Sequence, residues 1–112
     1  MNVLIVDDVK MVRDIFDGMF DNHPDIVSVC ASSYRDAVEK LKQFHFDFAV
    51  IDIVLESEPD GNDLAKFIMD NYHDTRVFMM TGFNDATAIH GVEAVLQKPV
   101  SVDELVDLIK GE

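Results

Sequence analysis

Short apolar runs alternate with amphipathic segments along this chain, and that alternation limits the fold more than any other feature. The strands that these runs predict lie at residues 3–6, 26–31, 48–52, 76–80 and 93–96. Runs of this length are too short for buried helices, and they are rich in the β-branched and bulky apolar residues that are typical of strands. Because strands that are apolar throughout need cover on both faces, we expect a parallel sheet between two layers of helices.

The segments between the runs have the spacing of amphipathic helices. Residues 10–22 place six apolar side chains on one stripe, and similar stripes lie in residues 34–44 and around residues 64–68. Ser33 and Ser101 are the expected N-caps of the second and the last helix. Residues 84–90 have room for only a short helix. We therefore predict one domain over residues 1–112, an α/β three-layer sandwich with a doubly wound, five-stranded parallel sheet, five helices and right-handed crossovers.

Four of the apolar runs lead into reactive side chains. Asp7 and Asp8 follow the first run, Asp52 ends the third, Thr81 follows the fourth, and Lys98 follows the last. The carboxyl ends of parallel strands share one edge of a sheet, and open α/β sheets bind ligands at that edge. We therefore expect three carboxylates, a hydroxyl and an ammonium group to lie together.

This set of groups suits phosphoryl chemistry. Three adjacent carboxylates repel one another, so at least one should have a raised pKa, and a Mg²⁺ ion would relieve the repulsion. Asp52 is the natural nucleophile, while Lys98 and Thr81 can bind phosphoryl oxygens. Taken singly, these residues are more often a solvated acidic loop, a surface lysine and a strand-end hydroxyl. Their joint placement favours the site.

Charge and composition exclude several classes of function. The formal net charge is −13, which argues against binding to nucleic acid or to an anionic membrane surface. No apolar run approaches the ~20 residues of a membrane span, and no signal peptide is visible. The single cysteine, Cys30, excludes an internal disulfide and is expected to be a small buried hydrophobe. A cytoplasmic location is the default expectation.

With these residues identified, the chain resembles the response-regulator receiver domains of the CheY-like superfamily, and the single-domain type in particular. The resemblance covers nearly the whole chain. Its motifs are Asp7-Asp8, Asp52, Asp60-Gly61, Thr81-Gly82, Gly91 and Lys98-Pro99. It implies the sheet order 2-1-3-4-5 and a role in two-component, or phosphorelay, signal transduction.

The resemblance also implies a role for each site residue. Asp52 is the phosphoacceptor, and Asp8, Asp52 and the backbone carbonyl of Val54 ligate Mg²⁺, with Asp7 acting largely through water. Thr81 and Lys98 bind the phosphoryl group, and the peptide bond between Lys98 and Pro99 is cis. A histidine kinase or phosphotransfer protein donates the phosphoryl group. Output is expected to run through a partner protein, with the chain a monomer or a phosphorylation-dependent dimer.

Three departures from the family bear on how the chain signals. Val95 replaces an aromatic residue that moves with the threonine in the family. The interval from Thr81 to Lys98 is short, so the fourth helix should be stunted or replaced by a loop. Val54 and Phe83 are apolar at the two positions that tune dephosphorylation, which predicts slow loss of the phosphoryl group.

Two alternatives to a working switch remain open at this point. Val95 and the short fourth-helix region favour a receiver-fold binding module with little or no switching. A Mg²⁺-dependent phosphatase acting on external substrates is weaker, because the chain has no insertion large enough to bind a substrate. The complete set of Asp7, Asp8, Asp52, Thr81 and Lys98 favours the working switch over both.

Overall fold

Five parallel strands form the centre of the fold in a computed structural model that describes residues 1–55, 59–82 and 87–111. Their order across the sheet is β2-β1-β3-β4-β5. The strands are β1 (Asn2–Val6), β2 (Val27–Ala31), β3 (Phe48–Asp52), β4 (Arg76–Thr81) and β5 (Ala94–Gln97). The doubly wound parallel sheet, the positions of its strands and the order 2-1-3-4-5 are confirmed.

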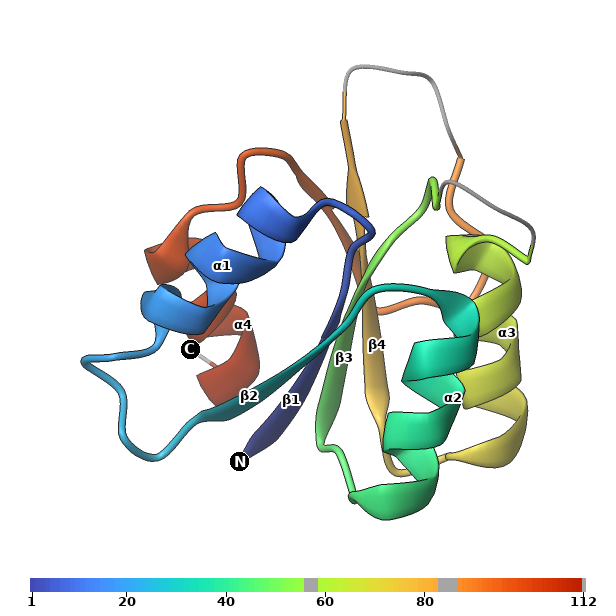
Figure 1. Cartoon of the computed structure of the whole chain (residues 1–112), viewed down its shortest axis with the longest axis horizontal. Coiled ribbons are helices and arrows are strands. Elements are labelled where there is room, and N and C mark those ends of the chain that lie inside the picture. Colours follow the sequence, from blue (N-terminus) through green and yellow to red (C-terminus); the bar gives the residue numbers. More distant parts are fainter. Residues whose placement is uncertain (56–58, 83–86, 112) are drawn as a thin grey trace.

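Helices cover both faces of the sheet, as Figure 1 shows. Helices α1 (Lys10–Met19) and α4 (Val102–Lys110) pack on one face, and α2 (Tyr34–Gln43) and α3 (Gly61–Asn71) pack on the other. Ser33 accepts a hydrogen bond from the Asp36 N–H and Ser101 accepts one from the Glu104 N–H, so both expected N-caps are confirmed. No helix in the described part of the chain is long and apolar enough to cross a membrane.

The prediction of five helices is corrected to four within the described residues. Residues 87–93 form no helix. Residues 83–86, which include Phe83, lie outside the described part of the chain. The expectation that a loop takes the place of the fourth helix therefore holds for residues 87–93. The physical reason is length, since twelve residues separate β4 from β5 and most of them are needed to cross from one end of the sheet to the other.

The core consists of two apolar layers, one on each face of the sheet. Side chains along a strand point alternately to opposite faces, so Leu4 and Ile51 face α2 and α3, whereas Ile5 and Val50 face α1 and α4. All five residues of β3 are buried. This is the pattern expected of a central strand with helices on both sides.

Two expectations about burial need correction. The apolar stripe of α1 is wider than the face that packs on the sheet, because Phe16 is buried whereas Met11 is 72% exposed and Ile15 is 59% exposed. Cys30 is only partly buried, and its thiol donates a hydrogen bond to the carboxylate of Asp17, 3.2 Å away. The cysteine is therefore in a polar contact with α1 and is not a simple core residue.

A glycine fixes where α3 begins relative to the end of β3. A Cβ atom added to Gly61 would lie 1.8 Å from the backbone oxygen of Asp52, so no other residue fits without movement of the backbone. Asp60 and Asp63 form a reciprocal capping box around this first turn. The N-terminus of α3 is thereby held directly against the last residue of β3.

Candidate functional site

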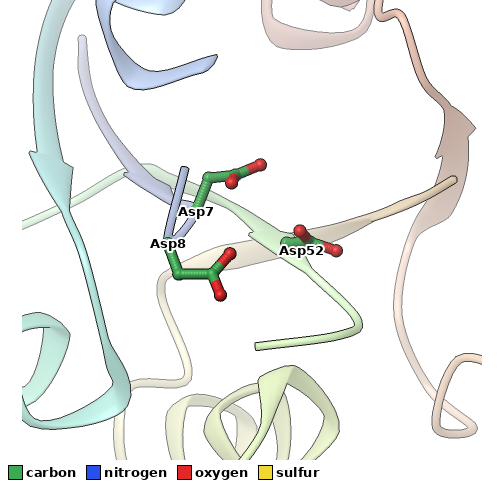
Figure 2. A group of neighbouring side chains, drawn as sticks. All are labelled: Asp7, Asp8 and Asp52. Atoms are coloured by element: carbon green, nitrogen blue, oxygen red, sulfur yellow. The ribbon is translucent and has the colours of Figure 1, made fainter. Parts of the chain in front are cut away.

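Three carboxylates meet at the carboxyl edge of the sheet. Asp7 and Asp8 directly follow β1, and Asp52 is the last residue of the neighbouring strand β3. Each offers a carboxylate oxygen within 4.8 Å of the others, and Figure 2 shows the three side chains close together. The strand order reverses between β1 and β3, so the cluster occupies the switch point where ligands bind in folds of this kind.

Lys98 reaches the cluster from the far edge of the sheet, just after β5. Its Nζ lies 2.6 Å from Asp7 Oδ2 and 2.8 Å from Asp52 Oδ2. Both carboxylates are buried, and the lysine side chain is 23% exposed. One ammonium group therefore neutralises part of the charge of two buried acids. The expected cis bond between Lys98 and Pro99 is confirmed.

The second oxygen of each buried carboxylate accepts a backbone hydrogen bond. Asp7 Oδ1 accepts from the Val9 N–H at 2.9 Å, and Asp52 Oδ1 accepts from the Val54 N–H at 3.1 Å. Both carboxylates are thus held in the same way, by Lys98 on one oxygen and by the N–H two residues further along on the other. This arrangement fixes the orientation of the Asp52 carboxylate before any ligand arrives.

Burial raises the pKa of the Asp52 carboxyl above the ordinary value for an aspartate. Hydrogen bonding and attraction by Lys98 oppose this effect, and the charge of Asp7 adds to it. Burial by itself lowers the pKa of the Lys98 ammonium, but its bonds to Asp52 and Asp7 outweigh that effect and the pKa is raised. The expected raised pKa in the acidic cluster is therefore found at Asp52, with burial as its main cause and repulsion as a smaller one.

Thr81, the last residue of β4, has a buried hydroxyl oxygen without a hydrogen-bond partner in the described ranges 1–55, 59–82 and 87–111. Buried hydroxyl groups are normally paired, and an unpaired one carries a cost in stability. The Thr81 carbonyl accepts a hydrogen bond from the Lys98 N–H at 2.8 Å, which ties the threonine to the lysine. An oxygen atom of a ligand would satisfy the free hydroxyl.

The structure brings Asp7, Asp8, Asp52 and Lys98 together, and it joins Thr81 to Lys98 through the backbone. Val54 lies two residues beyond Asp52, to whose carboxylate its N–H donates, and it is 45% exposed.

Sequence reasoning missed several features of the site. Arg13 on α1 donates a hydrogen bond to the Asp7 backbone oxygen at 2.9 Å, and the paired contacts of Lys98 with two carboxylates were not expected. No spacing signal in the sequence links Arg13 to Asp7 specifically. A Gly directly after Asp60 was a visible motif, but its contact with the Asp52 carbonyl depends on how α3 meets β3.

An apolar groove lies beside the site, between α1 and the residues that follow β5. Its volume is about 310 Å³, and its walls include Ile15 and Met19 of α1 together with Pro99 and Val100. Lys98 is also among its lining residues. The groove is therefore bordered both by α1 and by the lysine whose ammonium group contacts Asp52.

The sequence profile of the response regulator receiver domain matches residues 3–110. The chain belongs to this family. The receiver domain is a signalling module of two-component response regulators. A curated relative, the protein-glutamate methylesterase/protein-glutamine glutaminase of Hydrogenovibrio crunogenus, is 34% identical over 96 residues, which are 85% of this chain and 25% of the relative. The chain thus spans about a quarter of that protein's length.

Solved receiver structures have the same fold. The signal receiver domain of an HD domain-containing protein from Pseudomonas fluorescens superposes with a TM-score of 0.89 at 22% identity, over 98% of this chain and 91% of the other. A CheY-like receiver domain protein from Methanospirillum hungatei has a TM-score of 0.81 at 23% identity, over 99% and 98% of the two chains. At these identities the likeness establishes the fold alone.

Proposed function

We propose that this receiver domain is a phosphorylation-dependent switch in which Asp52 accepts a phosphoryl group from a histidine kinase or phosphotransfer protein. The observation that carries the proposal is the pairing of a buried, oriented Asp52 carboxylate with Lys98 at 2.8 Å, together with a Thr81 hydroxyl that has no hydrogen-bond partner among the described residues. A nucleophile, a cation and a hydrogen-bond donor are then present together. Phosphoryl transfer depends mainly on such positioning and charge neutralisation.

The reaction follows from these groups. A carboxylate oxygen of Asp52 forms a bond to phosphorus as the bond between phosphorus and the donor's imidazole nitrogen breaks, which leaves an acyl phosphate on Asp52. The Lys98 ammonium can then bind a phosphoryl oxygen in place of Asp52 Oδ2, and the Thr81 hydroxyl can donate to another. Asp7 keeps its own bond to Lys98, which holds the lysine at the site.

Asp7, Asp8 and Asp52, with the backbone carbonyl of Val54, are the residues that would hold Mg²⁺. The fit rests on three carboxylates that each place an oxygen within 4.8 Å of the others, since oxygen ligands are those that Mg²⁺ prefers. When bound, the ion would neutralise charge on the carboxylates and on the phosphoryl oxygens.

The apolar face of α1 is the proposed docking site for the phosphodonor protein. Met11 and Ile15 are largely exposed, and Ile15 lines the apolar groove together with Lys98. A protein that covers this face therefore reaches the site directly, and the burial of its apolar side chains would supply binding energy that a small phosphodonor lacks. Downstream partners are expected to be proteins as well, given the acidic charge of the chain.

Phosphorylation of the intact chain by a small acyl phosphate tests the proposal without the need for a cognate kinase. In the presence of Mg²⁺, the intact mass should rise by one phosphoryl group in the wild type and in Asp14→Asn, a control at an exposed aspartate of α1. Asp52→Asn should take up no label, and EDTA should prevent labelling of the wild type. Decay of the label should be slow, because the apolar side chain of Val54 cannot orient an attacking water.

A receiver-fold binding module without a working switch is the second candidate. Two observations favour it: residues 87–93 form no helix, and the Val95 side chain is 48% exposed and contributes to neither core layer. Amide chemical shifts of the labelled protein separate the two. A switch should show changes in β4 and in residues 87–97, whereas a binding module should show changes only around Asp52.

A further inference from the structure

Residues 87–93 lie against α3 without a helix of their own. The side chains of Ala88, Ile89 and Val92 pack on the core layer formed with α2 and α3. The Glu93 N–H donates to the Val77 carbonyl at 2.8 Å, where the segment enters β5. Because backbone groups outside a helix or sheet still need hydrogen-bond partners, a segment like this depends on side chains to hold it.

Asn62, in the first turn of α3, supplies two such partners. Its Nδ2 donates to the Thr87 carbonyl at 2.8 Å, and its Oδ1 accepts from the Ile89 N–H at 2.8 Å. These two backbone groups flank Ala88, so the amide of Asn62 binds the segment as the peptide group of a neighbouring strand would. The two bonds use both the donor and the acceptor of the side chain, a combination that no apolar or acidic residue can reproduce.

The same turn of α3 touches the proposed phosphoacceptor. Gly61 precedes Asn62 and packs so closely on the Asp52 carbonyl that a Cβ atom would lie 1.8 Å from it, and the Gly61 N–H donates to the Ile53 carbonyl at 3.1 Å. The capping box of Asp60 and Asp63 stiffens this turn. Gly61 and Asn62 are consecutive residues, and together they join the end of β3 to the 87–93 segment. The Asn62 side chain is the one flexible group in this connection.

We propose that Asn62 is a positioning residue that couples the state of Asp52 to the 87–93 segment through the first turn of α3. A change in charge or contacts at Asp52 shifts the end of β3. Gly61 moves with it because its Cα packs directly on the Asp52 carbonyl. Asn62 then carries the movement to the backbone at Thr87 and Ile89 through its two hydrogen bonds. The use of this coupling in signalling rests on the proposed function, whereas the coupling itself does not. It provides a route that does not pass through Val95.

Amide hydrogen exchange at Ile89 measures the first half of the proposal. In Asn62→Ala the Ile89 amide should exchange about fivefold faster than in the wild type, since a single hydrogen bond and the local order it supports are lost. Asn62→Asp keeps the acceptor for the Ile89 N–H but turns a carboxylate oxygen towards the Thr87 carbonyl, so it should restore only part of the protection of Ile89. Asn71→Ala is the matched control, because Asn71 lies in the same helix and its side-chain amide donates to the Phe67 carbonyl of that helix.

A double-mutant cycle measures the coupling and needs no phosphodonor. Asp52→Asn should change the amide shifts and exchange rates of residues 87–92 when Asn62 is present, and the change should fall by at least about half in the Asn62→Ala background. If Asn62 only held the segment in place, Asn62→Ala would lower the protection of the Ile89 amide but would leave the effect of Asp52→Asn on residues 87–92 unchanged. The cycle therefore separates coupling from a purely structural role.

Either of two results would overturn the proposal: equal Ile89 exchange in Asn62→Ala and Asn71→Ala, or an Asp52→Asn effect on residues 87–92 of the same size with and without Asn62. Failure of the wild type to take up label would count against the proposed function alone, since neither the exchange comparison nor the cycle uses phosphorylation.

Discussion

Replacement of Lys98 by methionine should destabilise the protein in the absence of divalent cations. Methionine keeps much of the length of the lysine side chain but removes the charge that bridges Asp7 and Asp52 at 2.6 and 2.8 Å. Loss of one partner from a fully buried ion pair costs roughly 3–5 kcal/mol. Because the lysine is 23% exposed and solvent screens part of the interaction, we expect a loss of about 2–3 kcal/mol in the free energy of unfolding.

Urea denaturation at pH 7 with EDTA measures this loss, and Lys66→Met is the matched control. Lys66 lies 2.8 Å from Asp70, nearly the same distance, but its side chain is 63% exposed. The control should therefore lose much less stability than Lys98→Met. Equal losses in the two variants would refute the idea that burial makes the Lys98 contacts strong.

The deficit of Lys98→Met should also depend on pH. The folded-state pKa of Asp52 is already raised, and removal of the cation raises it further. A carboxyl whose pKa is raised by folding favours the folded state below its unfolded pKa of about 3.9, and this contribution is lost as the pH rises through the folded pKa. The deficit should thus be largest at pH 7 and should shrink as the pH falls towards 4.5. A deficit that is constant over this range would contradict the assignment.

Three further predictions test other parts of the structure. Asp52→Asn should raise the midpoint of thermal unfolding in EDTA at pH 7 by about 2–4 °C, because an ionised carboxylate with a raised pKa disfavours the folded state; a lower midpoint would contradict this. Gly61→Ala should lower stability by more than about 2 kcal/mol, whereas Gly18→Ala in α1, where the nearest atom is 4.0 Å away, should raise it slightly; equal midpoints in urea would show that the contact with Asp52 is not tight. Burial, helped by the hydrogen bond to Asp17, raises the pKa of the Cys30 thiol from 9.0 to about 12. Alkylation by iodoacetamide at pH 8 should therefore be about a thousandfold slower than for a free thiol, and Asp17→Ala should speed it. Alkylation at the rate of a free thiol would refute the buried contact.

The sheet and most of the site could be predicted because both follow from local patterns. A buried strand such as β3 is a continuous apolar run, and the residue that ends such a run must lie at the carboxyl edge. Asp52, Thr81 and Lys98 could therefore be placed together without any knowledge of the contacts between them. The cis bond at Lys98-Pro99 was expected from the family resemblance and not from the residues themselves.

Features that depend on how separate elements meet could not be predicted. The fifth helix was expected from the alternation of segments, but residues 87–93 pack on α3 as an irregular segment held by Asn62. An asparagine in the first turn of a helix gives no sign of a partner twenty-five residues away. Likewise, the stripe on α1 did not distinguish Phe16, which packs on the sheet, from Met11, which is exposed, since helical spacing gives a face but not its width.

Chemical trapping of the acyl phosphate tests the central claim most directly. After labelling with a small phosphodonor and Mg²⁺, borohydride reduces an aspartyl phosphate to homoserine, and peptide mass spectrometry identifies the residue that was converted. We predict conversion at Asp52 alone in the wild type and none in Asp52→Asn. Conversion at Asp7 or Asp8, or no conversion in a protein that is folded and supplied with Mg²⁺, would contradict the assignment of Asp52 as the phosphoacceptor.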